Sequence, residues 1–472
     1  MKLKNGAISV WLALGTVLPA IPAMGADDSA RIQELERRLQ ELDQKYRVLE
    51  RRLEIEGEAA TEKAKTAPSM SIGAQGFSYR SADTNFVLKI RGLLQADSRF
   101  YIDDGGNNRN DTFLIRRARP IIEATLWDNI DLTLVPEFGG GSNTADGNPT
   151  SSASILDAYA NIRYSPELQL RVGKFKSPVG LEQLQSDSQA YFMERGLPSS
   201  LTPNRDVGLM LHGEVFDGVV NYQAAVLNGV GDNRNSPNLD IDDDKDVAAR
   251  LFFHPFQKLD IEALQGLGVG IAGTSGNHDG VQGINSYGTE GAQTYFSYNP
   301  QNATVRADGT AWRLTPQAYY YWRSLGLIGE YVVSSQEVRA SASNTNGVSG
   351  FGELQHKAWQ IVGGYVLTGE DASFRGVNPK KPFSLASNQW GAWEVVARYS
   401  HLDIDDEAFP IFSNPSTSAT EAHGYGFGIN WYANRNVRTS LNYIHTDFKG
   451  GENGTVTRED ENAVLTRLQL AF

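Results

Sequence analysis

The sequence predicts an all-β protein: a transmembrane antiparallel β-barrel of about sixteen strands, preceded by a short N-terminal coiled-coil helix. Three observations predict this fold. From about Asn85 to the end of the chain, apolar and polar residues alternate with a period of two. The alternating segments run about 10 to 16 residues, the length that a tilted strand needs to cross a bilayer. Tight turns and long polar loops alternate between them, as they do on the two sides of outer-membrane barrels.

The composition narrows the possible classes of protein. The chain has 472 residues, of which 21% are charged, and a net charge of -13. It contains no cysteine, so disulfide bonds and thiolate metal sites are excluded. Its seven histidines form no HExxH motif or close pair in the sequence, and neither a GxSxG motif nor a Walker loop is present. We therefore predict no catalytic residues, no metal site, no cofactor and no nucleic-acid partner.

The N-terminus has the three parts of a secretory signal peptide. Two lysines precede an apolar run, and small residues follow it. We predict cleavage near Ala26, which removes residues 1–25. The alternative is an uncleaved membrane anchor, but Pro19 and Pro22 interrupt the apolar run. No later segment has ~20 consecutive apolar residues, which excludes a helical membrane protein.

Residues 26–57 have the heptad pattern of a coiled coil, and residues 58–71 have the composition of a linker. A parallel assembly in register would form three charged pairs between neighbouring chains, Arg31 with Glu36, Arg38 with Asp43, and Lys45 with Glu50. We therefore predict homo-oligomerisation. The heptads do not decide between a coiled coil of two helices and one of three. The alternative is a solvated charged helix. Apolar or aromatic residues form the predicted seam at spacings of three and four: Ile32, Leu35, Leu39, Leu42, Tyr46, Leu49 and Leu53.

The first predicted strand of the barrel illustrates the alternation. One face is apolar, and the other carries polar side chains from Lys89 to Arg99, with Leu93 as the exception. A later strand alternates likewise, with Leu156 on the apolar face and Asp157 on the polar face. Soluble β-sandwiches also alternate, but their strands are usually only about 5 to 6 residues long. We expect the apolar faces to contact lipid and the polar faces to line a lumen.

The barrel is predicted to span residues 72–472. An even number of strands returns the chain to its starting side. Two connections on the short-turn side are long, from Pro255 to Gly266 and from Glu370 to Gly391. The third external connection, from Pro178 to Arg205, is longer than a simple crossing needs, and we expect it at the constriction of the pore. The strands are predicted to begin near residues 86, 112, 131, 155, 168, 207, 219, 245, 267, 311, 325, 356, 392, 423, 437 and 463.

Arginines on the inward faces suggest a path for anions. On the second strand, alternation points Arg117 and Arg119 inward, and Arg116 joins them only if a β-bulge or the strand's end redirects it. A guanidinium matches the oxygens of phosphate and stays protonated. The alternative is that inward arginines pair with inward carboxylates and stiffen the barrel. The same parity places further arginines around the wall: Arg91, Arg99, Arg163, Arg250, Arg398, Arg438 and Arg467.

A series of segments over roughly residues 72 to 472 resembles the phosphate-selective porin O/P family of outer-membrane porins. The resemblance implies a sixteen-stranded trimeric porin with inward-folded loops and an arginine-lined pore. It maps the paired arginines of the RRAR motif to Arg116 and Arg117, a lumenal aspartate to Asp157 and a loop arginine to Arg205. The segments are FLIRRARPIIEATLW, LRVGKFKSPVGLE, FMERGLP with RDVGLMLHGE, GLIGEYVVSSQEV, YVLTGE, GAWEVVARYSHLD and NRNVRTSLNYIHTDF.

Two further regions complete the predicted pore site. The third external connection adds Arg195. Some relatives also fold a long periplasmic turn inward, and here the turn from Glu370 to Gly391 would bring Arg375, Lys380 and Lys381. The set of residues predicted to contact anions is Arg91, Arg116, Arg117, Arg119, Asp157, Arg163, Arg195, Arg205, Lys380 and Lys381.

The chain ends on an apolar strand, AVLTRLQLAF, in which Leu468, Leu470 and Phe472 share one face. This ending resembles the signal that is read by the outer-membrane assembly machinery. We therefore predict a homotrimer in the outer-membrane lipid that passively conducts phosphate, polyphosphate or other small anions.

Two alternatives to this function remain open. The first is a general or weakly selective porin for small polar solutes, in which the coiled coil serves oligomerisation or linkage to the cell wall. The second, a barrel enzyme, requires an outward-facing Ser/His pair, and no serine nucleophile motif is evident.

Overall fold

The computed structural model describes residues 26–65, 67–102, 110–140, 142–143, 149–150, 153–240, 243–300, 303–342, 349–452 and 456–472. The chain divides between Ala67 and Pro68 into two compact units, and each is described by itself. The predicted signal peptide, residues 1–25, lies outside the described residues.

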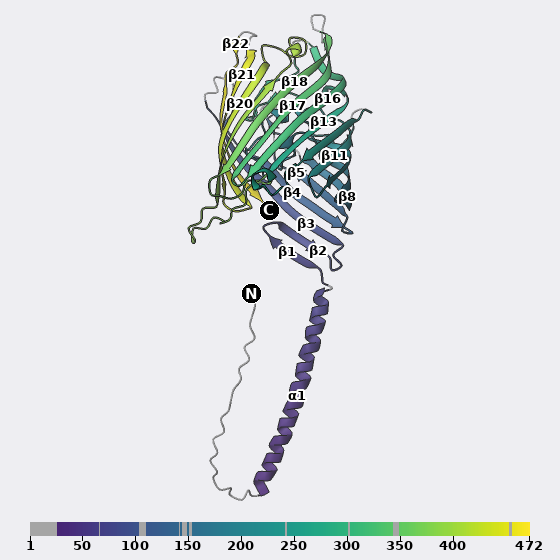
Figure 1. The fold of residues 1–472 in the computed structure, drawn as a ribbon, viewed down its shortest axis with the longest axis vertical. Coiled ribbons are helices and arrows are strands. Elements are labelled where there is room, and N and C mark those ends of the chain that lie inside the picture. Colours follow the sequence, from purple (N-terminus) through teal and green to yellow (C-terminus); the bar gives the residue numbers. More distant parts are fainter. Residues whose placement is uncertain are drawn as a thin grey trace. The chain divides into compact units, whose positions relative to one another are not determined.

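Helix α1 (Ala26–Lys65) forms the first unit (Figure 1). Ion pairs along the helix join residues three or four apart, such as Arg38 with Glu34 at 3.0 Å and Arg47 with Asp43 at 3.0 Å. The helix passes the predicted end at residue 57 because the following segment is rich in Ala, Glu and Lys, which are strong helix formers. No helix among the described residues is long and apolar enough to cross a membrane.

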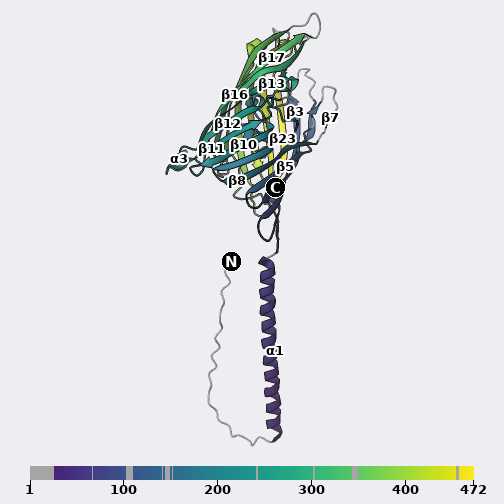
Figure 2. The same cartoon turned by 90° about the vertical axis from the view of Figure 1, so that its right-hand side faces the viewer.

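The second unit is a closed antiparallel barrel, and within the described residues it contains sixteen long strands (Figures 1 and 2). Each of the sixteen strands pairs with its neighbour among them, and β23 pairs with β3, so these strands form a closed ring. This confirms the predicted fold. The sixteen strands are β3 (Phe86–Ile102), β4 (Thr112–Leu126), β5 (Ile130–Glu137), β8 (Ser154–Ser165), β9 (Leu168–Lys176), β10 (Arg205–Val215), β11 (Val220–Leu227), β12 (Asp246–Phe253), β13 (Leu267–Gly280), β16 (Ala303–Trp322), β17 (Leu325–Ala342), β18 (Gly350–Val366), β19 (Ala392–Asp403), β20 (Ala419–Tyr432), β21 (Val437–Glu452) and β23 (Glu461–Ala471).

Short elements lie outside these sixteen strands. The hairpin of β1 (Ser69–Gly73) and β2 (Gly76–Arg80) extends the sheet beside β3. The others are the strands β6 (Ser142–Asn143), β7 (Pro149–Thr150), β14 (Tyr287–Gly288), β15 (Thr294–Phe296) and β22 (Val456–Thr457), and the helical turns α2 (Leu181–Leu184), η1 (Leu197–Leu201), α3 (Glu262–Gln265), η2 (Val281–Gly283) and η3 (Asp406–Ala408).

Most strands begin within two residues of the predicted position, but β16, β18 and β20 begin earlier. In β16 the reason is a register shift between Ala307 and Ala311 at Gly309, whose φ is +133°. The shift breaks the alternation that the prediction depended on. The strands contain 8 to 20 residues, a wider range than expected.

Two β-bulges decide which side chains enter the lumen. The β3–β4 register moves from Gln95 opposite Arg117 to Ala96 opposite Ile115, so Arg116 is the extra residue and can face inward beside Arg117. In the β5–β8 pairing the register moves from Val135 opposite Asp157 to Pro136 opposite Ile155, so Leu156 is the extra residue. The structure buries Leu156 at 8% exposure, so its predicted outward orientation is wrong.

Three connections fill part of the lumen. Phe192 and Met193 of the third external connection pack against inward residues such as Val396. Tyr295, from the long connection between β13 and β16, packs against the inward face in the same way. From the opposite end, Phe374 of the long turn between β18 and β19 contacts the same core as Phe192. The lumen is therefore narrowed from both ends.

The C-terminal residue completes the barrel. The backbone of Phe472 pairs with that of Gly92 through hydrogen bonds of 2.8 and 3.0 Å. A Cβ at Gly92 would lie 2.7 Å from the ring of Phe472, so this close approach needs glycine. Leu468, Leu470 and Phe472 remain exposed on the outward face, as the alternation predicts; their reading by assembly machinery stays a prediction.

Candidate pore and constriction

The lumen holds two large cavities. The periplasmic-side cavity, of about 1090 Å³, is bounded by the β1–β2 hairpin, β3, β4 and the tight turn between β20 and β21. The external cavity, of about 600 Å³, is bounded by residues of the connections from 177 to 204 and from 281 to 302. Arg119, Asp187 and Arg205 line both cavities, so they mark the place where the two meet. We call these three residues the junction.

Asp187, from the third external connection, forms ion pairs with two arginines of β4 and one of its own connection. Its carboxylate lies 2.5 Å from Arg195 and 3.4 Å from Arg117, and it also pairs with Arg119. Burial alone would raise the pKa of the Asp187 carboxyl, but the charges of Arg117, Arg195 and Arg119 hold it well below its usual range. Asp187 is therefore a permanent anion that fixes the guanidinium groups around it.

Glu194 acts in the same way seven residues further along the connection. Arg116 donates two hydrogen bonds to its carboxylate, at 2.7 and 3.0 Å, and Arg99 lies at 2.8 Å. Burial opposes ionisation, but Arg116 and its neighbours hold the pKa of Glu194 well below its usual range. The bidentate pair ties the bulge of β4 to the inward-folded connection.

The other two junction residues also have carboxylate partners. Arg205 donates to both oxygens of Asp157, at 3.1 and 3.3 Å. Arg119 pairs with Glu137, whose second oxygen accepts a 2.8 Å hydrogen bond from the backbone of Ala118. These pairs hold the planar faces of the guanidinium groups in fixed orientations at the junction of the two cavities.

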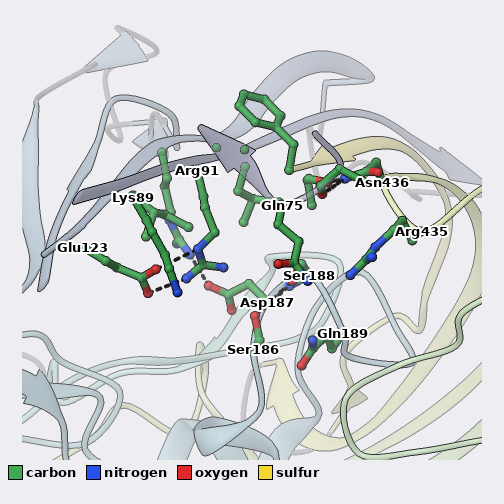
Figure 3. A pocket seen from close by; sticks show the side chains of 18 of the residues that line it. Gln75, Lys89, Arg91, Glu123, Ser186, Asp187, Ser188, Gln189, Arg435 and Asn436 are labelled. Carbon is green, nitrogen blue, oxygen red and sulfur yellow. Dashed lines mark hydrogen bonds and ion pairs between the residues drawn. The ribbon is translucent and has the colours of Figure 1, made fainter. Parts of the chain in front are cut away.

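Positive charge predominates in both cavities. Among the residues that the structure describes, nine basic and three acidic side chains line the periplasmic-side cavity, a formal excess of six positive charges. In the same described set, six basic and four acidic side chains line the external cavity. Figure 3 shows Lys89 and Arg91 on one side of the periplasmic-side cavity, Arg435 and Asn436 on the other, and Asp187 between them.

Comparison with known proteins identifies the family. The model described as phosphate-selective porin O and P matches residues 88–472. The chain belongs to the phosphate-selective porin O and P family. Porin O of Pseudomonas aeruginosa is 24% identical over 431 residues, which cover 84% of this chain and 91% of that protein.

Solved porin structures share the fold of this family member. The outer membrane channel DcaP of Acinetobacter baumannii matches with a TM-score of 0.51 at 9% identity, over 83% of this chain and 99% of that chain. OmpF of Salmonella typhi, solved in complex with daunomycin, matches with a TM-score of 0.50 at 11% identity, over 82% of this chain and 98% of that chain. This member of the porin O and P family is therefore a porin of the bacterial outer membrane.

The structure brings together most of the predicted site residues of this porin. Arg116, Arg117, Arg119, Arg195, Arg205 and Asp157 line the two cavities at or near the junction. Arg91 lines the periplasmic-side cavity and donates to Glu123 at 2.6 and 2.9 Å.

Three predicted residues lie elsewhere. Arg163 pairs with Asp131 at 3.1 Å, near the tight turn after β4, and lines neither of the two cavities within the described part of the chain. Lys380 and Lys381 are exposed and, in the same described regions, line neither cavity. Arg375, from the same turn, does line the periplasmic-side cavity. The turn folds inward through its first half because Phe374 packs into the core.

Sequence reasoning missed the two loop carboxylates and part of the basic wall. Asp187 and Glu194 lie in a connection without periodicity, so alternation could not assign them a direction. The only signal was that the connection was too long for a simple crossing. Arg435 was missed because it lies in a tight turn rather than on a strand face.

Proposed function

We propose that this porin conducts small anions passively, phosphate or a polyphosphate among them. The observation that carries the proposal is the excess of positive charge on both sides of a junction that itself contains two arginines. A lumen lined by one sign of charge raises the local concentration of the opposite ion. An anion can then pass between fixed guanidinium groups that replace part of its hydration.

The carboxylate of Asp187 in the junction, and that of Asp157 beside it, supply a means of discrimination among anions. Hydrogen phosphate keeps an OH group that can donate a hydrogen bond, whereas sulfate has none. Asp187 is held ionised, so it can accept that hydrogen bond while it repels an ion that cannot donate. We propose that Asp187, with Asp157 beside Arg205, favours protonated oxyanions over fully ionised ones.

We also propose the organisation of the whole chain: a signal peptide, a coiled-coil helix from residue 26 to 57, a linker and a barrel that forms a homotrimer. All seven seam residues of α1 are between 43% and 68% exposed in the single chain. Such an apolar stripe is stabilised when it packs against copies of itself. Deletion of residues 27–56 should leave monomers on a native gel; an unchanged trimer would make the helix auxiliary to assembly.

A general porin for small polar solutes is the second candidate. It is favoured by the carboxylate partner that each junction arginine has, because paired charges attract an anion less than free ones. In such a pore the opposed charges would form a transverse field and only a weak preference for anions would result.

Planar bilayer recordings separate the two candidates. We expect the purified wild-type protein to show an anion-selective reversal potential in a KCl gradient and to lose chloride current when phosphate is added. Arg205→Ala should weaken both effects, because it removes one of the two junction guanidinium groups. Arg163→Ala is the matched control, since this arginine is also paired with a carboxylate but lies outside both cavities.

The outcomes divide clearly. Cation preference in the wild-type protein would contradict the anion proposal. Anion preference without phosphate block would leave an anion-selective porin and contradict the phosphate proposal. Equal effects of Arg205→Ala and Arg163→Ala would contradict the role of the junction.

A further inference from the structure

The outward face of the barrel carries a cluster of metal-ligating side chains that plays no part in the pore. His401 of β19 lies directly opposite His423 of β20, and Asp403 lies opposite Glu421. Arg398 and Ser400 are buried inside the lumen, so His401 has the outward parity of its strand. The described connection from 404 to 418 follows the end of β19, which places the cluster near the external end of the barrel.

The three donor groups converge on one point. The Nε2 atoms of His423 and His401 lie 3.5 and 3.8 Å from Oε2 of Glu421. One ligand atom from each of the three side chains lies within 4.8 Å of the others. Bonds of about 2.0 to 2.1 Å to a tetrahedral ion require donor atoms roughly 3.3 Å apart. Small side-chain rotations therefore suffice to bring all three donors to one ion.

The surroundings of the histidines leave the required atoms free. Nδ1 of His423 is hydrogen-bonded to the hydroxyl of Tyr399 at 3.1 Å. When Nδ1 donates this hydrogen bond, Nε2 carries the lone pair and faces Glu421, which is the arrangement typical of metal-binding histidines. Nε2 of His401 is buried and has no hydrogen-bond partner among the described residues.

Charges on the neighbouring strand bear on the affinity. Lys449 of β21 lies 2.6 Å from Oε1 of Glu421 and leaves Oε2 for the ion. Asp447, on the same strand, lies opposite His423 and adds a second outward carboxylate to that of Asp403. The acidic neighbours favour a cation, whereas Lys449 competes with it for Glu421.

We propose that His401, Glu421 and His423 form a binding site for a divalent transition-metal ion such as Zn²⁺. Two imidazoles and one carboxylate suit this class of ion better than Ca²⁺ or Mg²⁺, which prefer oxygen ligands. Three protein ligands leave a coordination position open. The bound ion cross-links β19 and β20 and is separate from the anion path.

Calorimetric titration of Zn²⁺ into the detergent-solubilised full chain, with any affinity tag removed, tests the site. We expect one ion per chain, and His401→Ala or His423→Ala should weaken binding at least about tenfold. His445→Ala is the matched control, because this histidine is also outward-facing but is hydrogen-bonded to Asn462 at 2.9 Å. Absence of saturable Zn²⁺ binding to the wild-type protein would overturn the proposal. Unchanged Zn²⁺ affinity in a variant that carries both His401→Ala and His423→Ala would overturn it as well.

A variant that should bind Zn²⁺ more tightly keeps the test valid even if the alanine variants fail to fold. Lys449→Gln removes the competitor for Glu421, so it should tighten Zn²⁺ binding severalfold, and misfolding cannot produce that result. Co²⁺ gives a second readout, because its visible absorption distinguishes nitrogen and carboxylate ligation from hydrated ion. Chloride conductance should be the same in wild-type, His401→Ala and Lys449→Gln proteins. Affinity that is unchanged or weaker in Lys449→Gln would count against Glu421 as a ligand.

Discussion

The two cavities differ in how their positive charges are held. Among the described residues, all six basic side chains of the external cavity have a carboxylate partner, whereas in the periplasmic-side cavity only Arg91, Arg119 and Arg205 do. A compensated guanidinium contributes mainly rigidity, and an uncompensated one contributes an attractive field for anions. Charge pairs therefore hold the external cavity rigid, and the periplasmic-side cavity supplies most of the electric field that attracts anions. Its other basic residues have no carboxylate within 4.0 Å in the described part of the chain: Arg80, Lys89, Lys176, Arg375, Arg435 and Arg438.

A substitution at Asp187 removes the ion pairs that hold the external cavity rigid. Asp187→Asn leaves three arginines without their shared partner in a site where the carboxylate is 4% exposed. Removing one side of a buried charged pair typically costs about 3 to 5 kcal/mol. We expect a decrease of that size in the free energy of unfolding, measured by denaturant titration of tryptophan fluorescence in detergent.

An exposed carboxylate gives the control for this change. Asp217 pairs with Lys258 at 2.6 Å, but its side chain is 88% exposed. Asp217→Asn should leave the unfolding midpoint unchanged, because water screens exposed pairs. Equal midpoints for the two variants would show that the arginines around Asp187 do not depend on it.

The field of the periplasmic-side cavity can be tested by comparing free and paired basic residues. Arg435→Gln removes a charge that no carboxylate in the described part of the chain compensates, whereas Arg91→Gln removes one that Glu123 compensates. One unscreened charge about 8 Å from the ion path changes the permeability ratio roughly twofold. We expect that decrease in the ratio of chloride to potassium permeability for Arg435→Gln.

Arg91→Gln has a further consequence that separates it from Arg435→Gln. It leaves Glu123 unpaired in the cavity, so it should lower anion preference at least as much, and a second change, Glu123→Gln, should restore it. Reversal potentials in a KCl gradient measure all three proteins. Failure of Glu123→Gln to restore anion preference would contradict the distinction between paired and free charges.

The barrel itself could be predicted from the sequence because each strand repeats the same two-residue period. The positions of most strands and the inward direction of Arg117 and Arg119 follow from that period, and closure follows from the even number of strands. The two-residue period failed at Leu156, because this residue is itself the extra residue of a β-bulge and nothing in its neighbours signals the bulge. Arg116 could be assigned only as an alternative for the same reason.

Contacts between segments that are distant in the sequence could not be predicted from the alternation of polar and apolar residues. Asp187 and Glu194 take their positions from packing of an irregular connection in the lumen, with Phe192 and Met193 as its apolar anchors. Charge pointed to Arg375, Lys380 and Lys381 alike, but the packing of Phe374 brings only the first half of the turn, with Arg375, to the cavity. His401 and His423 lie far apart in the sequence, and only the β19–β20 register makes them neighbours.

The smallest expected effect concerns pH and again separates two carboxylates of the external cavity. Burial raises the pKa of Glu290 to about 7, against the lowering effect of Arg398, whereas Asp187 stays ionised well below that pH. As the pH falls from 8 to 6, Glu290 gains a proton and the external cavity loses one negative charge. Anion preference should therefore rise modestly on acidification, by less than the twofold effect expected for Arg435→Gln.

Reversal potentials at pH 8 and pH 6 measure this change, and Glu290→Gln shows its origin. The glutamine is neutral at both pH values, so the variant should have the high anion preference of the acidic wild-type protein throughout. A wild-type reversal potential that does not change with pH would mean that Arg398 keeps Glu290 ionised. The charges of the external cavity would then all be held in pairs. The two cavities would differ even more in how their charges are compensated than proposed.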